Sequence, residues 1–178
     1  LDPTFLVDRS TWENLATETP GEEDFIFCYF LNSDHGYKSA VTAAAEQLGC
    51  RIIGVSADGR DTEWLELNND ITPEEFLERI KKARAIFTDS FHGTALSLIM
   101  NKEFYVFERF ERSDPVNQNS RIYSVLKKAG LSDRIVSVNG NADLSQKIDY
   151  NRTNRLIEAE RQKSAAFLKK ALGDSNDD

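Results

Sequence analysis

The sequence has few of the residues that define several protein classes. Its 178 residues include only two cysteines, four prolines and nine glycines, too few for a disulfide scaffold, a collagenous repeat or a proline-rich disordered segment. No apolar run approaches the roughly 18 residues that a membrane-spanning helix needs, and the first residues lack the pattern of a secretion signal. These absences indicate a globular chain, and we expect residues 1–178 to form one domain.

Basic charge is also scarce. Thirty acidic side chains against 22 basic ones give a formal net charge of −8, so we expect no nucleic-acid partner, and an anionic ligand must be held by a local cluster. Cys28 and Cys50 lie in apolar segments without a metal-binding spacing, which predicts buried thiols in a cytoplasmic, reducing compartment. Asp58 and Asp61 lack a third ligand, so we expect no metal site.

The apolar pattern alternates between the period of strands and the period of helices. It predicts strands at about 25–31, 51–57, 85–89, 103–109 and 134–138, and helices at about 37–48, 72–83, 91–100, 121–129 and 154–172. The helix that follows Thr72 begins with a capping box, in which Glu75 is the acidic partner. This alternation favours an α/β, Rossmann-like open parallel sheet with helices on both faces. We expect residues 173–178 to fray.

Polar residues gather in the turn between the third predicted strand and its helix. A helix that begins near Phe91 would direct free N–H groups and its positive dipole end toward the sheet edge, with the hydroxyl groups of Ser90 and Thr94 nearby. Such an arrangement binds phosphate or carboxylate. His92, in the first turn, is able to exchange a proton near neutral pH.

A purely structural interpretation of the same turn stays open. Asp89 or Ser90 caps a buried helix in that case, and His92 is a hydrogen-bonded core residue. Gly93 then only permits close packing of the helix on the strand.

Arginines after the next strand are candidate anion ligands, because a guanidinium binds carboxylate or phosphate through two hydrogen bonds. Arg109 and Arg112 follow the strand that ends at the same sheet edge. Alternatively, both belong to a solvated charge cluster with Glu108 and Glu111. Arg121 is either a third cation or a surface residue of the following helix.

Three further residues are weaker candidates for a role in function. His35 follows the first predicted strand, but a solvent-exposed turn histidine is the simpler interpretation. Trp12 and Trp64 are interpreted as core or domain-interface anchors rather than as platforms for a sugar ring.

Several segments resemble one known family. The segment DSFHGT, the buried helix after it and NKEFYVF closely resemble the polysaccharide pyruvyl transferase family, as do LDPTFLVDRSTWENLA, PEEFLERIKKARAIFTDSFHGT, NSRIYSVLKKAGLSDRIV and IDY before the last helix. The resemblance covers nearly the whole chain. It implies transfer of pyruvate from phosphoenolpyruvate, as a ketal, to sugars of a cell-surface polysaccharide. It also implies two Rossmann-like domains in a glycosyltransferase-B-like arrangement, of which this chain is the C-terminal one.

The resemblance also implies roles for individual residues. His92 matches the functional histidine of the family, and Arg112 lies nearest the usual position of a functional basic residue. Ser90 stands where many members have arginine, so backbone N–H groups or other cations would hold the phosphate instead. We therefore expect His92 to be catalytic and expect the following residues to bind substrate: Asp89, Ser90, Gly93, Thr94, Arg109 and Arg112.

The expected partners follow from the same resemblance. They are phosphoenolpyruvate as the donor substrate, a saccharide acceptor and the chain's own N-terminal domain. The acceptor is either free or lipid-linked. We expect no cofactor besides the donor substrate. Two alternatives remain: a nucleotide-sugar-dependent glycosyltransferase, since such folds bind diphosphates at helix N-termini, and a non-catalytic domain that binds a glycan or a partner, which Ser90 would favour.

Overall fold

The sheet of this protein is built from six short parallel strands. The computed structural model describes residues 1–17, 24–32, 35–57, 59, 62–110, 119–137 and 140–173. The strands are β1 (Phe25–Phe30), β2 (Arg51–Ser56), β3 (Glu66–Leu67), β4 (Ala85–Thr88), β5 (Phe104–Phe107) and β6 (Ile135–Val136). They lie in the order β3-β2-β1-β4-β5-β6, and every pair is parallel. The predicted α/β, Rossmann-like fold is confirmed.

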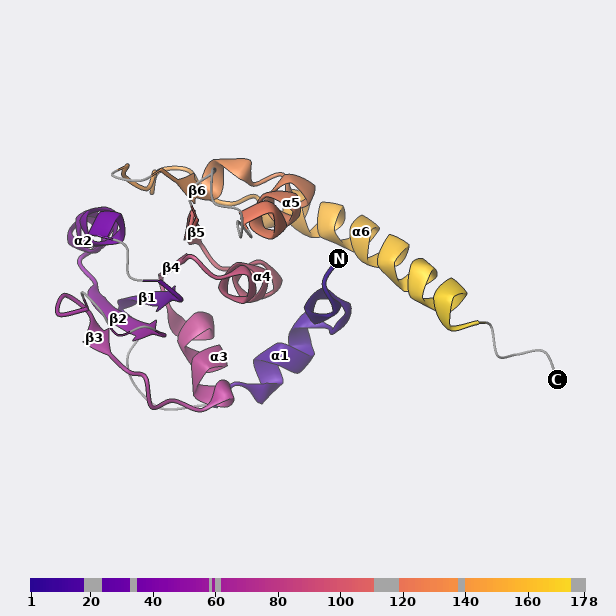
Figure 1. Ribbon diagram of the computed structural model, residues 1–178, viewed down its shortest axis with the longest axis horizontal. Helices are drawn as coiled ribbons and strands as arrows, with labels where there is room; N and C mark the ends of the chain where they lie inside the picture. Colours follow the sequence, from indigo (N-terminus) through magenta and orange to yellow (C-terminus); the bar gives the residue numbers. More distant parts are fainter. Residues whose placement is uncertain are drawn as a thin grey trace.

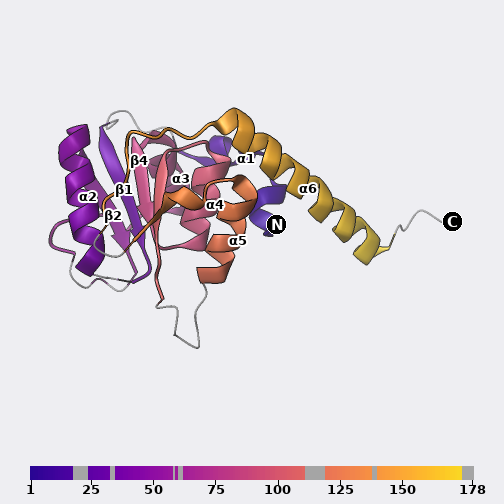
Figure 2. The same ribbon diagram turned by 90° about the horizontal axis from the view of Figure 1, so that it is seen from above.

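Helices connect these strands and cover both faces of the sheet (Figure 1). They are α1 (Arg9–Leu15), α2 (His35–Leu48), α3 (Pro73–Lys82), α4 (Phe91–Ile99), α5 (Asn119–Ala129) and α6 (Tyr150–Leu172), with short 3-10 helices η1 (Pro3–Leu6) and η2 (Ser132–Arg134). Thr72 and Glu75 form the predicted capping box of α3. Figure 2 shows the later turns of α6 projecting away from the sheet, and Phe167 on these turns is 70% exposed.

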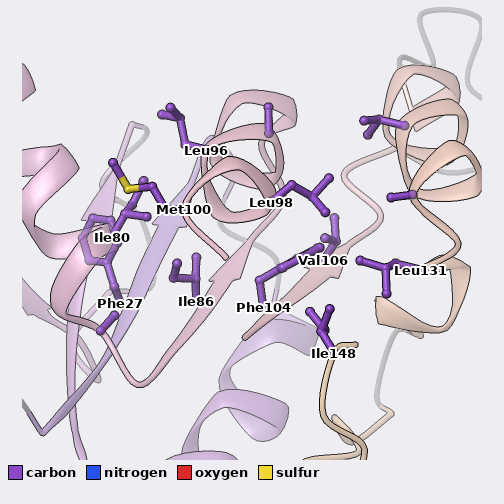
Figure 3. Close-up of a cluster of buried hydrophobic side chains, with 14 of the residues drawn as sticks. Phe27, Ile80, Ile86, Leu96, Leu98, Met100, Phe104, Val106, Leu131 and Ile148 are labelled. Atoms are coloured by element: carbon purple, nitrogen blue, oxygen red, sulfur yellow. The ribbon is translucent and has the colours of Figure 1, made fainter. Parts of the chain in front are cut away.

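Successive residues of the central strands face two separate hydrophobic cores, because side chains alternate along a strand. Phe27 of β1 and Ile86 of β4 pack with α3, α4 and α5, and Figure 3 shows part of this cluster. Cys28 and Phe87, one residue further along each strand, pack on the opposite face with α2. Burial on both faces explains why these strands are apolar throughout.

The strand order reverses direction between β1 and β4. The helix α2 leads from β1 to β2 on one face, whereas α4 and α5 lead from β4 to β5 and from β5 to β6 on the other. In such sheets ligands bind beyond the carboxyl ends of the strands at the reversal point. The residues that follow β1, β4 and β5 are therefore the first place to look for a site.

Several boundaries differ from the predicted ones. The segment before β1, for which no helix or strand was predicted, forms η1, whose N-cap is Asp2, and α1. β6 is only two residues long, and α6 begins at Tyr150, four residues earlier than predicted. Cys28 is buried as predicted, but the prediction for Cys50 is wrong, because this residue, between α2 and β2, is only partly buried.

The predicted frayed tail, 173–178, lies outside the described residues except for Gly173. Within the described part of the chain, no helix combines the length and the apolar character that crossing a bilayer requires.

Candidate functional site

The turn between β4 and α4 is fixed by hydrogen bonds of its own side chains. Ser90 is the N-cap of α4, and its hydroxyl oxygen accepts a bond from the Gly93 N–H at 3.4 Å. The Thr94 hydroxyl donates to the Ser90 carbonyl at 2.9 Å. Both hydroxyl groups are buried and engaged within the helix. Ser90 and Thr94 thus shape the turn, and their contact with a ligand stays a prediction.

Gly93 lies against the last residue of β4. A Cβ atom at this position would be 2.5 Å from the Oγ1 atom of Thr88. That oxygen donates to the Tyr29 carbonyl at 2.6 Å and accepts from the Ser90 N–H at 3.0 Å, so it has no freedom to move aside. The absence of a side chain at Gly93 therefore allows α4 to begin this close to the sheet.

His92 points out of the core. Its side chain is exposed, and its ring meets the Phe91 ring edge-on with centroids 5.5 Å apart. The interpretation of His92 as a buried, hydrogen-bonded core residue is therefore wrong. Within the described ranges, the backbone N–H groups of Phe91 and His92 have no hydrogen-bond partner. Two donors and an imidazole are thus available at the start of α4.

A cavity of about 170 Å³ opens beside His92 at the carboxyl edge of the sheet. Its walls come from the ends of β1, β4 and β5 and from the beginning of α5. The lining residues are Leu31, Asp89, Phe91, His92, Arg109, Phe110, Asn119, Arg121 and Ile122. We call this space the histidine cavity. Ser90, Gly93 and Thr94 are not among the described residues that line it.

Two arginines bring positive charge to the histidine cavity. The guanidinium carbon of Arg109 lies 4.5 Å from the centroid of the Phe110 ring, and that of Arg121 lies 4.2 Å from the Phe91 ring. Arg121 also donates to the Asp2 carboxylate at 3.3 Å. Burial raises the pKa of Asp2, but hydrogen bonds from Thr4 and the charges of His92 and Arg121 outweigh it and leave the pKa lowered. Arg121, whose position the sequence left open, therefore lines the histidine cavity.

Asp89 is the buried acid of the histidine cavity. Its two carboxylate oxygens accept the backbone N–H groups of Leu31 at 2.7 Å and Asn32 at 3.0 Å. Burial raises the pKa of Asp89 to about 6, although these hydrogen bonds and the charge of Arg109 act in the opposite direction. A carboxyl group that changes charge near neutral pH therefore forms part of the wall.

Sequence reasoning missed Asn119 and Leu31. Asn119 is 1% exposed, and its amide accepts from the Phe110 N–H at 3.4 Å and donates to the Phe110 carbonyl at 2.7 Å. These two bonds join the end of β5 to the start of α5. An asparagine at a helix start was the only available signal, and Leu31 is a wall residue that no local pattern marks.

The remaining candidates contribute less. Arg112, Asp58 and Asp61 lie outside the described residues. His35 is the first residue of α2, and its side chain lies outside the described part of the structure. Trp12 and Trp64 are partly buried against the two hydrophobic clusters, as the core interpretation requires. Among the described residues, no group of three or more histidine, cysteine or acidic side chains is arranged to hold a metal ion.

The sequence model of one family, polysaccharide pyruvyl transferase, matches residues 1–109. The chain belongs to this family. The match contains the whole turn from Asp89 to Thr94 and ends at Arg109, so α5 with Asn119 and Arg121 lies beyond it. No curated protein and no solved structure matches the chain. Membership supports a transferase that acts in polysaccharide synthesis.

Proposed function

We propose that this chain binds phosphoenolpyruvate in the histidine cavity and helps to transfer its pyruvyl group to a sugar of a polysaccharide. The observation that carries the proposal is the exposed imidazole of His92 beside Arg109 and Arg121. In a pyruvyl transferase, one group must move a proton and others must hold an anion. These three side chains have the required chemistry and line one cavity at the reversal point of the sheet.

Anion binding in this proposal depends on local charge, because the chain carries a formal net charge of −8. Phosphoenolpyruvate has a phosphate and a carboxylate close together. The two guanidinium groups and the N–H groups of Phe91 and His92 supply donors from two sides of the histidine cavity. Many members of the family have an arginine at the position of Ser90. We propose that Arg109 and Arg121 hold the anion in its place. Arg112, outside the described residues, remains a third candidate.

The chemistry proposed for His92 is proton transfer. Protonation of the methylene carbon of phosphoenolpyruvate makes the adjacent carbon electrophilic, and a sugar hydroxyl then adds to it and releases its proton. Cleavage of the bond between this carbon and the phosphate oxygen expels inorganic phosphate. A second sugar hydroxyl adds to the same carbon, loses its proton and closes the ketal. A histidine imidazole can both donate and accept a proton, so it suits both of these roles.

We also propose that the chain is the C-terminal domain of a cytoplasmic, glycosyltransferase-B-like enzyme. The acceptor is then a saccharide, free or lipid-linked, held partly by the other domain. A site shared between two domains is incomplete in either one. We therefore expect the 178-residue chain to fold but to form no ketal alone, whereas the full-length protein turns over. Ketal formation by the chain alone would contradict this.

The decisive experiment replaces His92 by alanine and by asparagine in the full-length protein. Phosphate release with phosphoenolpyruvate and acceptor is expected to fall by about 10²–10⁴-fold. Because the side chain is exposed, the melting temperature is expected to stay unchanged. His35→Asn is the matched control, since His35 is the only other histidine. A His92 variant that melts as the wild type and keeps most of its rate would refute the assignment.

Ligand competition separates this proposal from a glycosyltransferase. Phosphoenolpyruvate and a nucleotide sugar are offered to the full-length protein, and the resonances of the amides around the histidine cavity are followed by NMR. We expect phosphoenolpyruvate to shift the amide resonances of Phe91 and His92. Shifts caused by the nucleotide sugar alone would favour nucleotide-sugar-dependent glycosyl transfer instead.

A further inference from the structure

Asp89 connects the ends of β1 and β4, the two strands between which the strand order reverses direction. The parallel ladder of β1 and β4 ends at the pair Tyr29 and Thr88. Asp89 is the next residue of the second strand, and its carboxylate accepts the N–H groups of the next residues beyond the first strand, Leu31 and Asn32. One side chain thus extends the connection between the strands past the end of the ladder.

The burial of the Asp89 carboxylate costs free energy. Asp89 is only 1% exposed, and burying an ionised carboxylate is unfavourable unless it is hydrogen-bonded. An asparagine would offer one acceptor oxygen and turn its N–H₂ group toward the second donor, so one backbone N–H would lose its partner. A carboxyl group has one oxygen for each of the two backbone N–H groups, whereas an amide has only one, so this geometry favours aspartate over asparagine.

The same residue fixes two parts of the wall of the histidine cavity. Its side chain holds the turn that contains Leu31. Its backbone begins the turn between β4 and α4, which contains His92 and which we call the histidine turn. The charged and titratable groups that share the cavity with it are Arg109 after β5, Arg121 of α5 and His92 itself. An ionised Asp89 also repels an anion, so it is poorly suited to bind the donor directly.

We propose that Asp89 is a positioning residue, whose carboxylate holds the turn after β1 against the histidine turn and so shapes the histidine cavity before the donor binds. This role rests on the proposed function, because it concerns the same cavity. A site that is already organised does not lose binding free energy to ordering its walls. Loss of the two hydrogen bonds should therefore weaken donor binding.

The first test measures the hydrogen bonds without any activity. Amide hydrogen exchange of the 178-residue chain is followed by NMR for the wild type and for Asp89→Asn. We expect exchange at one or both of Leu31 and Asn32 to become at least about tenfold faster, since the single amide oxygen of asparagine cannot replace both carboxylate oxygens. The amide of Ile86, which bonds to the Glu103 carbonyl at 2.9 Å, should not change. Unchanged exchange at Leu31 and Asn32 would overturn the proposal.

The second test compares the kinetics of the full-length wild type and of Asp89→Asn. At a temperature at which thermal melts show both proteins to be folded, we expect KM for phosphoenolpyruvate to rise about tenfold or more with a smaller change in kcat, because the change acts on the organisation of the site. Glu108→Gln is the matched control. It removes a carboxylate at the same edge of the sheet, but this carboxylate accepts a hydrogen bond from the Tyr123 hydroxyl and not from the turn after β1. Faster exchange with unchanged KM and kcat would overturn the positioning role and leave the proposed function intact.

Two outcomes need separate treatment. If the wild-type protein does not use phosphoenolpyruvate, the proposed function fails, and amide exchange still decides whether Asp89 holds the turn. If Asp89→Asn does not fold, the wild type itself is titrated. The amide resonances of Leu31 and Asn32 should then shift together as the Asp89 carboxyl group is titrated, and resonances that do not shift anywhere between about pH 3 and pH 8 would overturn the proposal.

Discussion

Replacing Gly93 by alanine should destabilise the protein, because α4 begins too close to β4 for any side chain. The added Cβ atom would lie 2.5 Å from Thr88 Oγ1, 3.1 Å from its Cβ and 3.2 Å from its Cγ2. Thr88 is fully buried, and its hydroxyl group is held by Tyr29 and Ser90. The strand and the helix must therefore separate, or the two hydrogen bonds must break.

The expected magnitude follows from these contacts. Overpacking of a core costs about 1–3 kcal/mol, and weakening two buried hydrogen bonds costs about 1 kcal/mol each. Alanine in place of a helical glycine returns up to about 1 kcal/mol. Gly93→Ala should lower the free energy of unfolding by about 3 kcal/mol in total, a large part of the about 5–15 kcal/mol typical of a domain.

A double-mutant cycle with Thr88→Ala isolates the clash. That single change leaves the Tyr29 carbonyl and the Ser90 N–H unpaired, at a cost of about 2 kcal/mol. In the double variant the new methyl group of Gly93→Ala occupies the vacated space. We therefore expect a total loss of about 2 kcal/mol rather than the additive value of about 5 kcal/mol.

Urea unfolding of the 178-residue chain, followed by circular dichroism, measures all four corners of the cycle. The slopes against urea concentration should agree, so that midpoints report stability. If Gly93→Ala unfolds at the wild-type midpoint, or if the two losses simply add, the close approach of α4 to β4 is not what requires glycine here.

Three further changes test other parts of the structure. Folding raises the pKa of Asp89 from 3.8 to about 6, so the contribution of this group to stability is fully present below pH 3.8 and is lost as the pH rises through about 6. The free energy of unfolding of the wild type, relative to that of Asp89→Asn, should therefore fall by about 2 kcal/mol between pH 4 and pH 7. A difference that stays constant over this range would contradict the prediction. Arg134 is buried and donates to Glu103 at 3.1 Å. Arg134→Ala should therefore lower the free energy of unfolding in urea by about 3–5 kcal/mol. A decrease of less than about 1 kcal/mol would show that the ion pair is unimportant for stability. Thr72→Ala removes the α3 cap and should cost about 1 kcal/mol, whereas Thr42→Ala, whose hydroxyl bonds only carbonyls of its own helix, should cost nothing.

The sequence by itself determined most of the layered fold. Buried parallel strands are apolar along their whole length, as in Phe25–Phe30, and this pattern needs no knowledge of the partner strands. The capping box at Thr72 was equally predictable, because all of its groups lie within four residues. The histidine turn was found in the same way, since its residues are consecutive. Local patterns sufficed wherever the interacting groups are neighbours in the chain.

The elements that the sequence missed are short or depend on distant contacts. The strand β3 has two residues, too few for any period, and it exists because it pairs with Ile53 and Gly54 of β2. The helix α1 buries none of its own residues fully, so it lacks a strong apolar stripe.

Only the tertiary structure decided where the side chains of the candidate site residues lie. Asp89, Ser90 and His92 all stood in one polar turn, but the carboxylate points to β1, the hydroxyl caps α4, and the imidazole is exposed. Arg121 joined the site, although it lies 29 positions beyond His92, because α5 packs beside α4. A local pattern fixes which backbone conformation a residue adopts. The direction and partners of its side chain depend on segments that folding brings together from elsewhere in the chain, and these no local pattern records.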